Sequence, residues 1–141
     1  MSYNLYDDVK ETPIYTKEEI QAVVSRMGAE ISRDYADKNP VMISVLRGAF
    51  VFMADLVRAV TIPCKIDFMA VSSYGAGTES SGRVRILKDL DTNIEGRHVI
   101  IVEDVLDSGV TLSKLIEMLK SRGPASLTVC TMFNKCIVYI K

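Results

Sequence analysis

The sequence predicts an α/β protein, a parallel β-sheet flanked by helices, and two observations lead to this class. Short apolar runs typical of buried strands alternate along the chain with longer segments whose apolar residues recur at helical spacing. Such alternation is typical of a parallel sheet covered by helices on both faces. The 141 residues, 48% of them hydrophobic and 25% charged, suit a single domain over residues 1–141.

The first helix is expected from about Lys17 to Tyr35. Thr16 followed by Glu19 has the spacing of a capping box, in which side chains and backbone at the helix start bond reciprocally. Apolar residues then recur on one face as far as Ile31. The dipeptide Asn39-Pro40 ends this helix.

A buried strand and a second helix come next. The short apolar run Val41–Leu46 is read as the strand. Arg47-Gly48 then forms a tight turn. The helix that follows has its apolar positions at Phe52, Leu56 and Val60.

Two further strands are expected at Ile66–Val71 and Val84–Leu87. The segment between them, residues 72–82, is rich in Ser and Gly. Because it is too small and polar to pack, we expect a mobile loop of the length usually kept for function.

The clearest unit begins at His98, which we read as the start of a strand without a catalytic role. Val99–Val102 is a buried strand, and the segment Glu103–Thr111 leads from it into a helix that Gly123-Pro124 closes. The apolar face of that helix consists of Leu112, Leu115, Ile116 and Leu119. A final strand is expected at Leu127–Phe133.

The segment Glu103–Thr111 carries the candidate chemistry. In open α/β sheets, ligands bind outside the carboxyl ends of the strands, which is where this segment lies. Its second half offers small residues, two hydroxyls and free backbone N–H groups at the positive end of a helix dipole, as a phosphate site requires. Glu103 and Asp104 would repel a phosphate unless they hold a magnesium ion or ribose hydroxyls.

A simpler interpretation stays open on the residues alone. Asp107 or Ser108 would then be an ordinary helix N-cap, and Glu103-Asp104 a solvated strand end. The order of apolar strand, acidic pair, third acid, small residues and helix favours the phosphate site over this alternative.

Val102–Thr111 resembles the phosphoribosyl diphosphate motif of type I phosphoribosyltransferases: two acids, two apolar residues, Asp, a hydroxyl residue, Gly, any residue, Thr. Other stretches resemble the hypoxanthine/guanine branch of that family. They are Leu46-Arg47-Gly48, Ser73-Tyr74-Gly75 continued by residues 85–90, and Arg122–Ala125 with Asn134-Lys135. The resemblance implies the type I phosphoribosyltransferase fold. It also implies purine salvage, in which 5-phosphoribosyl passes from phosphoribosyl diphosphate to hypoxanthine or guanine, giving IMP or GMP and diphosphate.

The resemblance further implies roles for the residues of the main motif. Asp107 would be the catalytic base that removes the proton from purine N7. Glu103 and Asp104 would hold the ribose hydroxyls and a Mg²⁺ ion, the implied cofactor. The 5′-phosphate would be cradled by Ser108, Gly109, Val110 and Thr111.

The other stretches are implied to complete the site. Arg47 and Gly48 would face the diphosphate, and in the family the peptide before the basic residue can be cis. Ser73 and Tyr74 would close over the site and exclude water. Lys135 would donate to the 6-oxygen of the purine. Without the resemblance, Arg47 reads as a surface charge and Lys135 as part of a frayed end.

Composition limits the partners. A net charge of −1 and a pI near 5.8 give no bulk attraction to nucleic acid or to a membrane surface, and no apolar run is long enough to span a bilayer. The polar N-terminus and three cysteines without metal-type spacing lead us to expect a cytoplasmic protein. The resemblance implies phosphoribosyl diphosphate and a 6-oxopurine base as substrates, and a homo-oligomer, dimer or tetramer.

The resemblance ends near Lys135. Family members continue into strands that carry a ring stacking on the purine, an aspartate for a second magnesium and an arginine for diphosphate. Cys136–Lys141 contains no counterpart, so we expect a domain that is incomplete at its C-terminus. The alternative function is a non-catalytic or inactive phosphoribosyl-diphosphate-binding module. A dinucleotide-binding domain is disfavoured, because no G-x-G-x-x-G follows a strand.

Overall fold

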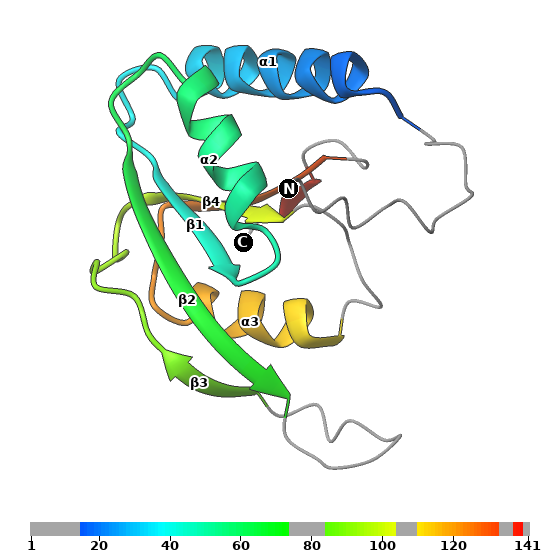
Figure 1. The fold of residues 1–141 in the computed structure, drawn as a ribbon. Coiled ribbons are helices and arrows are strands. Elements are labelled where there is room, and N and C mark those ends of the chain that lie inside the picture. Colours follow the sequence, from blue (N-terminus) through cyan, green and yellow to red (C-terminus); the bar gives the residue numbers. More distant parts are fainter. Residues whose placement is uncertain (1–14, 74–83, 104–109, 133–136, 140–141) are drawn as a thin grey trace, which may run out of the picture.

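A computed structural model describes residues 15–73, 84–103, 110–132 and 137–139 (Figure 1). In chain order the elements are α1 (Lys17–Asp34), β1 (Val41–Leu46), α2 (Phe50–Ala59), β2 (Lys65–Ser73), β3 (Val84–Lys88), β4 (His98–Glu103), α3 (Val110–Lys120), β5 (Ser126–Thr131) and β6 (Ile137–Tyr139). Figure 1 shows α1 and α2 on one side of the sheet and α3 on the other.

The strands form one sheet in the order β3-β2-β1-β4-β5-β6. β1 runs parallel to β2 and β4, and β4 runs parallel to β5, so the centre of the sheet is parallel. β3 and β6 lie at the edges and are antiparallel to their neighbours. The expected α/β class is confirmed, and antiparallel pairing is confined to the two edges.

Strand β1 shows why the central strands read as continuous apolar runs. Val41 and Ile43 pack in the core on the α3 side, whereas Met42 packs in the core beneath α1 and α2. All three side chains are fully buried. Side chains of a strand alternate between the two faces, so a strand covered on both sides is apolar at most of its positions.

Helix α1 begins where its capping box places it. The Thr16 hydroxyl accepts a hydrogen bond from the Glu19 N–H at 3.1 Å, and the Glu19 carboxylate accepts one from the Thr16 N–H at 3.4 Å. The helix ends at Asp34, one residue earlier than expected. No helix in the described part of the chain is long and apolar enough to cross a membrane.

The remaining boundaries differ from expectation by a few residues. β2 extends to Ser73 rather than Val71, and β5 ends at Thr131 rather than Phe133. Strand β6, which pairs Tyr139 with Leu127 of β5, is not among the strands expected from the sequence.

Candidate functional site

The candidate site lies at the edge of the sheet where the parallel strands end. Ser44 of β1 pairs with Val102 of β4, and Leu46 pairs with Ala70 of β2, so the segments that follow these strands leave the sheet together. Helix α3 begins at Val110 and connects the parallel strands β4 and β5, which places its N-terminal end at this same edge. The carboxyl edge of an open α/β sheet is where ligands bind.

The turn after β1 presents the predicted Arg47-Gly48 pair to solvent. The peptide bond between Leu46 and Arg47 is cis, as the resemblance implied. The Arg47 carbonyl accepts a hydrogen bond from the Phe50 N–H at 3.3 Å, which closes the turn onto the first residue of α2. Arg47 is exposed and forms no ion pair with the residues that the structure describes, so its guanidinium is available to an anion.

Gly48 leaves space that a side chain would fill. A Cβ at this position would meet no atom of the described chain within 4 Å, and the backbone is not in the left-handed conformation that favours glycine. Gly28, in contrast, is required by packing, because a Cβ there would lie 2.5 Å from the carbonyl oxygen of Ala59. The fold therefore does not itself require glycine at position 48, whereas a ligand that approaches the backbone of the turn would.

Glu103 brings a carboxylate to the same edge. It is the last residue of β4, is half-buried, and lies opposite Thr131 of β5. Close by in the chain, the first N–H groups of α3 have no acceptor within the helix, and the helix dipole makes this end positive. An anion at the start of α3, with a cation or hydroxyl groups beside Glu103, would match these charges.

The structure brings together those predicted residues that it describes. These lie at or next to the carboxyl edge of the sheet: Arg47, Gly48, Ser73, Glu103, Val110 and Thr111. The other predicted residues lie outside the described part of the chain: Tyr74, Asp104, Asp107, Ser108, Gly109 and Lys135. Among described residues, no group of three or more His, Cys, Asp or Glu side chains could hold a metal ion. Of the predicted magnesium ligands, the structure describes Glu103, whose carboxylate is a suitable oxygen donor.

Sequence patterns did not single out Asp67, which shapes the connection between β3 and β4. This buried carboxylate of β2 accepts hydrogen bonds from the N–H groups of Phe68 at 2.8 Å, Asp91 at 3.0 Å and Thr92 at 2.9 Å. Burial raises the pKa of the Asp67 carboxyl, but hydrogen bonds from Thr92, Phe68 and Asp91 outweigh burial and hold the pKa below its usual range. The sequence signal that could have identified Asp67 is its position as the one acid in the otherwise apolar expected strand Ile66–Val71.

Asp89 and Arg122 form a second contact that the sequence did not predict. Nη1 and Nη2 of Arg122 donate to the two carboxylate oxygens of Asp89 at 2.8 and 2.9 Å. This two-pronged bond, with the N–H of Leu90, holds the pKa of the Asp89 carboxyl below its usual range. The pair joins the connection after β3 to the chain just beyond α3, at the far end of that helix from Val110.

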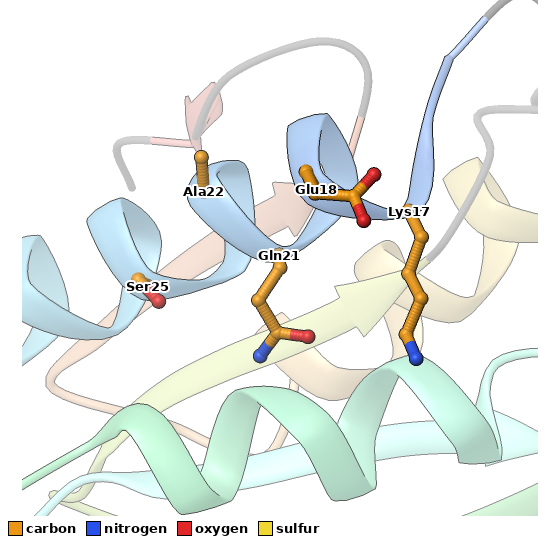
Figure 2. Close-up of a pocket in the computed structure, with 5 residues that line it drawn as sticks. All are labelled: Lys17, Glu18, Gln21, Ala22 and Ser25. Atoms are coloured by element: carbon orange, nitrogen blue, oxygen red, sulfur yellow. The ribbon is translucent and has the colours of Figure 1, made fainter.

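A hollow of ≈ 280 Å³ lies on the N-terminal half of α1. Its lining residues are Lys17, Glu18, Gln21, Ala22 and Ser25 (Figure 2). Figure 2 shows Lys17 and Gln21 extending from α1 in the direction of α2. All of these lining side chains are exposed and come from one helix, so they do not gather reactive groups from separate elements.

A second hollow of ≈ 310 Å³ lies between α1 and the first residues of β4 and β5. Within it, His98 Nδ1 and the Ser126 hydroxyl share a hydrogen bond of 2.7 Å, and the Tyr35 and Thr128 hydroxyls share another of 2.7 Å. These groups satisfy one another, and His98 begins β4 at the opposite end from Glu103.

Comparison with known proteins defines the class first. Residues 12–137 match the sequence family described as the phosphoribosyl transferase domain. This match covers most of the chain, and the chain belongs to the phosphoribosyltransferase family.

The relatives then point to one branch of that family. The hypoxanthine-guanine phosphoribosyltransferase of Mycobacterium tuberculosis (strain ATCC 25618 / H37Rv) is 50% identical over 137 residues, which cover 93% of this chain and 68% of the relative. The enzyme of the same name from Streptococcus thermophilus (strain CNRZ 1066) is 47% identical over 131 residues, covering 93% of this chain and 72% of the relative. These relatives confirm the resemblance found in the motifs.

Solved structures agree with this branch. The crystal structure of a hypoxanthine phosphoribosyltransferase from Staphylococcus aureus superposes with a TM-score of 0.84 at 43% identity, covering 89% of this chain and 68% of that chain. A hypoxanthine-guanine phosphoribosyltransferase from Bacillus anthracis superposes with a TM-score of 0.79 at 42% identity, covering 86% of this chain and 71% of that chain. The expected type I phosphoribosyltransferase fold is thereby confirmed.

Proposed function

We propose that this chain acts in purine salvage, transferring 5-phosphoribosyl from phosphoribosyl diphosphate to hypoxanthine or guanine with release of diphosphate. One observation carries the proposal. An exposed arginine beside an unobstructed glycine, a carboxylate, and the N-terminal end of a helix all meet at the carboxyl edge of one sheet. A sugar that carries phosphate at two positions needs a separate anion site at each and a hydroxyl or metal partner between them.

The described residues fit the two ends of phosphoribosyl diphosphate. Arg47 supplies a charge and bidentate donors for the diphosphate, and the open space at Gly48 lets the ligand approach the backbone. The start of α3, at Val110 and Thr111, supplies N–H groups for the 5′-phosphate together with Ser108 and Gly109. Glu103, with Asp104, holds the ribose hydroxyls between these two anion sites.

The reaction exchanges diphosphate at C1 of the sugar for a purine nitrogen. Positive charge develops on the sugar and negative charge on the leaving diphosphate, so positioning and electrostatic stabilisation dominate catalysis. Asp107 takes the proton from N7 of the purine. Ser73 and Tyr74 exclude water, which competes as a nucleophile. Lys135 donates to the 6-oxygen, which favours hypoxanthine and guanine over adenine.

The carboxylates of Glu103 and Asp104 suit a magnesium ion, since hard cations prefer oxygen ligands. When bound, the ion would neutralise charge on the diphosphate and orient the sugar. Replacing both acids by their amides is expected to weaken magnesium-dependent binding of phosphoribosyl diphosphate. Calorimetry measures this, and equal affinity without the two acids contradicts the role.

The proposed function is tested on the chain as given. Formation of IMP from hypoxanthine and phosphoribosyl diphosphate is measured with magnesium present, and binding of phosphoribosyl diphosphate alone is measured by calorimetry. Turnover supports the enzyme. Binding without turnover identifies a non-catalytic binding module, and absence of both contradicts the proposal.

We also propose a cytoplasmic homo-oligomer, dimer or tetramer, built from a single domain over residues 1–141. Support for self-association comes from Phe50 and Val51 in the first turn of α2, whose exposed fractions are 56% each. Light scattering after size-exclusion chromatography measures the oligomeric state. A monomer at micromolar concentration contradicts this part of the proposal.

A further inference from the structure

We infer that the Arg122–Asp89 ion pair is a positioning element for the candidate phosphate-binding end of α3. The pair lies at the far end of the helix from Val110, and its hydrogen bonds involve none of the site residues that the structure describes. This inference rests on the proposed function, because it concerns the affinity of the same site for phosphoribosyl diphosphate. Neither residue is assigned a role in binding or catalysis by that function.

The contacts of α3 fall into two kinds. Leu115, Ile116 and Leu119 are buried against the sheet on one face of the helix. Apolar packing is non-directional, so it determines which face is buried more firmly than where the helix lies along its own axis. Directional contacts are needed to fix the axial position.

Those directional contacts gather just beyond the C-terminal end of α3. Arg122 donates to both oxygens of Asp89, a fork that fixes orientation as well as distance. The Gly123 carbonyl accepts a hydrogen bond from the Gly96 N–H at 2.8 Å, which ties the same turn to the segment before β4. The side-chain exposed fractions of Arg122 and Asp89 are 30% and 48%, so the pair is partly shielded from water.

Asp89 is a fixed anchor because its own segment is held to the sheet. Its carboxylate also accepts the Leu90 N–H at 2.7 Å. The Lys88 ammonium donates to the carbonyl of Asp89 at 2.9 Å and to that of Phe68 in β2 at 3.0 Å. The buried Asp67 carboxylate also accepts hydrogen bonds from the N–H groups of Asp91 and Thr92, which follow in the same segment.

The axial position of α3 matters at its other end. The helix rises about 1.5 Å per residue and is stiff over its length, so a shift at Lys120 is passed along roughly 15 Å to Val110. N–H groups bind a phosphate only at hydrogen-bond distance, about 2.7–3.2 Å between N and O, so a displacement of about 1 Å breaks these bonds. An ion pair remote from the ligand therefore sets the fit of the phosphate cradle.

Helix α3 also carries a matched control pair. Lys114 and Glu117 lie 3.6 Å apart on its exposed surface, and both belong to the helix itself. Removing that pair changes charge and local helix stability, but it leaves the tie between α3 and the β3–β4 connection intact. A general loss of helix stability and a loss of positioning are thereby separated.

The experiment compares Arg122→Ala, Asp89→Asn, the double variant and Lys114→Ala in the full chain. Calorimetry with magnesium and phosphoribosyl diphosphate gives the affinity. Hydrogen exchange without ligand follows the N–H groups in the second turn of α3, which bond to the carbonyls of its first turn. We expect Arg122→Ala and Asp89→Asn each to weaken affinity roughly fivefold, which is smaller than the loss of rate of about 10²-fold that a 1 Å misplacement of reacting groups can cause. The double variant should be no weaker than the singles, because the residues act as one unit. Arg122→Lys should fall between, since it keeps the charge without the fork.

Faster exchange in the second turn of α3 is expected for Arg122→Ala and Asp89→Asn, whereas Lys114→Ala should leave the affinity unchanged even where it alters local helix stability. Asp89→Asn keeps side-chain size and remains informative if Arg122→Ala does not fold. Unaltered affinity and exchange in the Arg122 and Asp89 variants, alongside a lower melting temperature, overturn the inference and leave a structural role. If the unmodified chain binds no phosphoribosyl diphosphate, the proposed function fails, and hydrogen exchange alone decides for or against positioning.

Discussion

Gly28 of α1 lies directly against Ala59 of α2. A Cβ at Gly28 would lie 2.5 Å from the carbonyl oxygen of Ala59 and 2.7 Å from its carbonyl carbon. Backbone atoms of a helix end cannot yield as a flexible side chain can. The absence of a side chain at position 28 therefore sets how closely the two helices approach.

We expect Gly28→Ala to lower the free energy of unfolding by up to about 2 kcal/mol. Overpacking destabilises by roughly 1–3 kcal/mol, and the better helix propensity of alanine offsets about 1 kcal/mol of this. Urea denaturation measures the change. An equal or higher midpoint would show that the helices separate freely.

Gly48→Ala, in contrast to Gly28→Ala, should affect ligand binding and leave stability nearly unchanged. Its Cβ would meet no atom of the described residues within 4 Å, so the free energy of unfolding should stay within about 0.5 kcal/mol of the original. Affinity for phosphoribosyl diphosphate should fall roughly tenfold, or about 1.4 kcal/mol, because the ligand needs the backbone surface that the methyl group covers. Denaturation and calorimetry on one preparation test both parts, and unchanged affinity removes the turn from the site.

Asp67 should make stability depend on pH. Its pKa in the folded protein is lowered, so its contribution is fully present above the unfolded pKa of about 3.9 and is lost as pH falls through the folded value. Asp67→Asn should lower the free energy of unfolding by about 1–3 kcal/mol at pH 7, because the carboxylate accepts three N–H groups. The difference between the two proteins should shrink below about pH 4. A difference that is constant between pH 7 and pH 3 would contradict this account.

Ser44 should be replaceable with a gain in stability. Its hydroxyl is fully buried in β1 and has no hydrogen-bond partner in the described part of the chain. Ser44→Ala is expected to raise the free energy of unfolding by about 1 kcal/mol. Thr128→Val is the matched contrast, because the Thr128 hydroxyl bonds that of Tyr35 at 2.7 Å and its loss should destabilise by a similar amount. Two changes of the same sign would argue against hydrogen bonding as the cause.

Asp107→Asn should leave binding of phosphoribosyl diphosphate nearly intact while it lowers turnover. The substitution keeps side-chain size and removes proton acceptance, so about a 10²-fold or larger loss is expected of a general base. Steady-state rates of IMP formation measure the effect, with calorimetry as the control for binding. Unchanged turnover would reassign Asp107 to a helix cap.

Local signals predicted the elements well. Thr16 and Glu19 fixed the start of α1, because a capping box acts within one helical turn. Continuous apolar runs predicted β1 and β4, since both of their faces are covered. The antiparallel edge strands β3 and β6 depend on which neighbour a strand meets in space, and short patterns do not encode that choice.

The candidate site could be predicted from the sequence where its residues are adjacent in the chain, as in Glu103–Thr111. The contacts that support the site could not be predicted in this way. Arg122 and Asp89 are 33 positions apart, and their contact depends on the positions of both α3 and the β3–β4 connection. Asp67 is an isolated acid whose three N–H donors come partly from a segment 24 and 25 positions later. Such long-range polar contacts leave no periodic pattern.

The pairing of β1 with β4 bears on the order in which the chain folds. Val41 pairs with Val99, and α2, β2 and β3 lie between these two residues in the chain. The entropy of closing a loop must be lost before contacts between distant positions stabilise the fold, so such contacts tend to form late. The arginine turn after β1 and the acidic end of β4 therefore come together late in folding. A newly made chain should gain its affinity for sugar diphosphate at the step that joins these two strands, and not gradually.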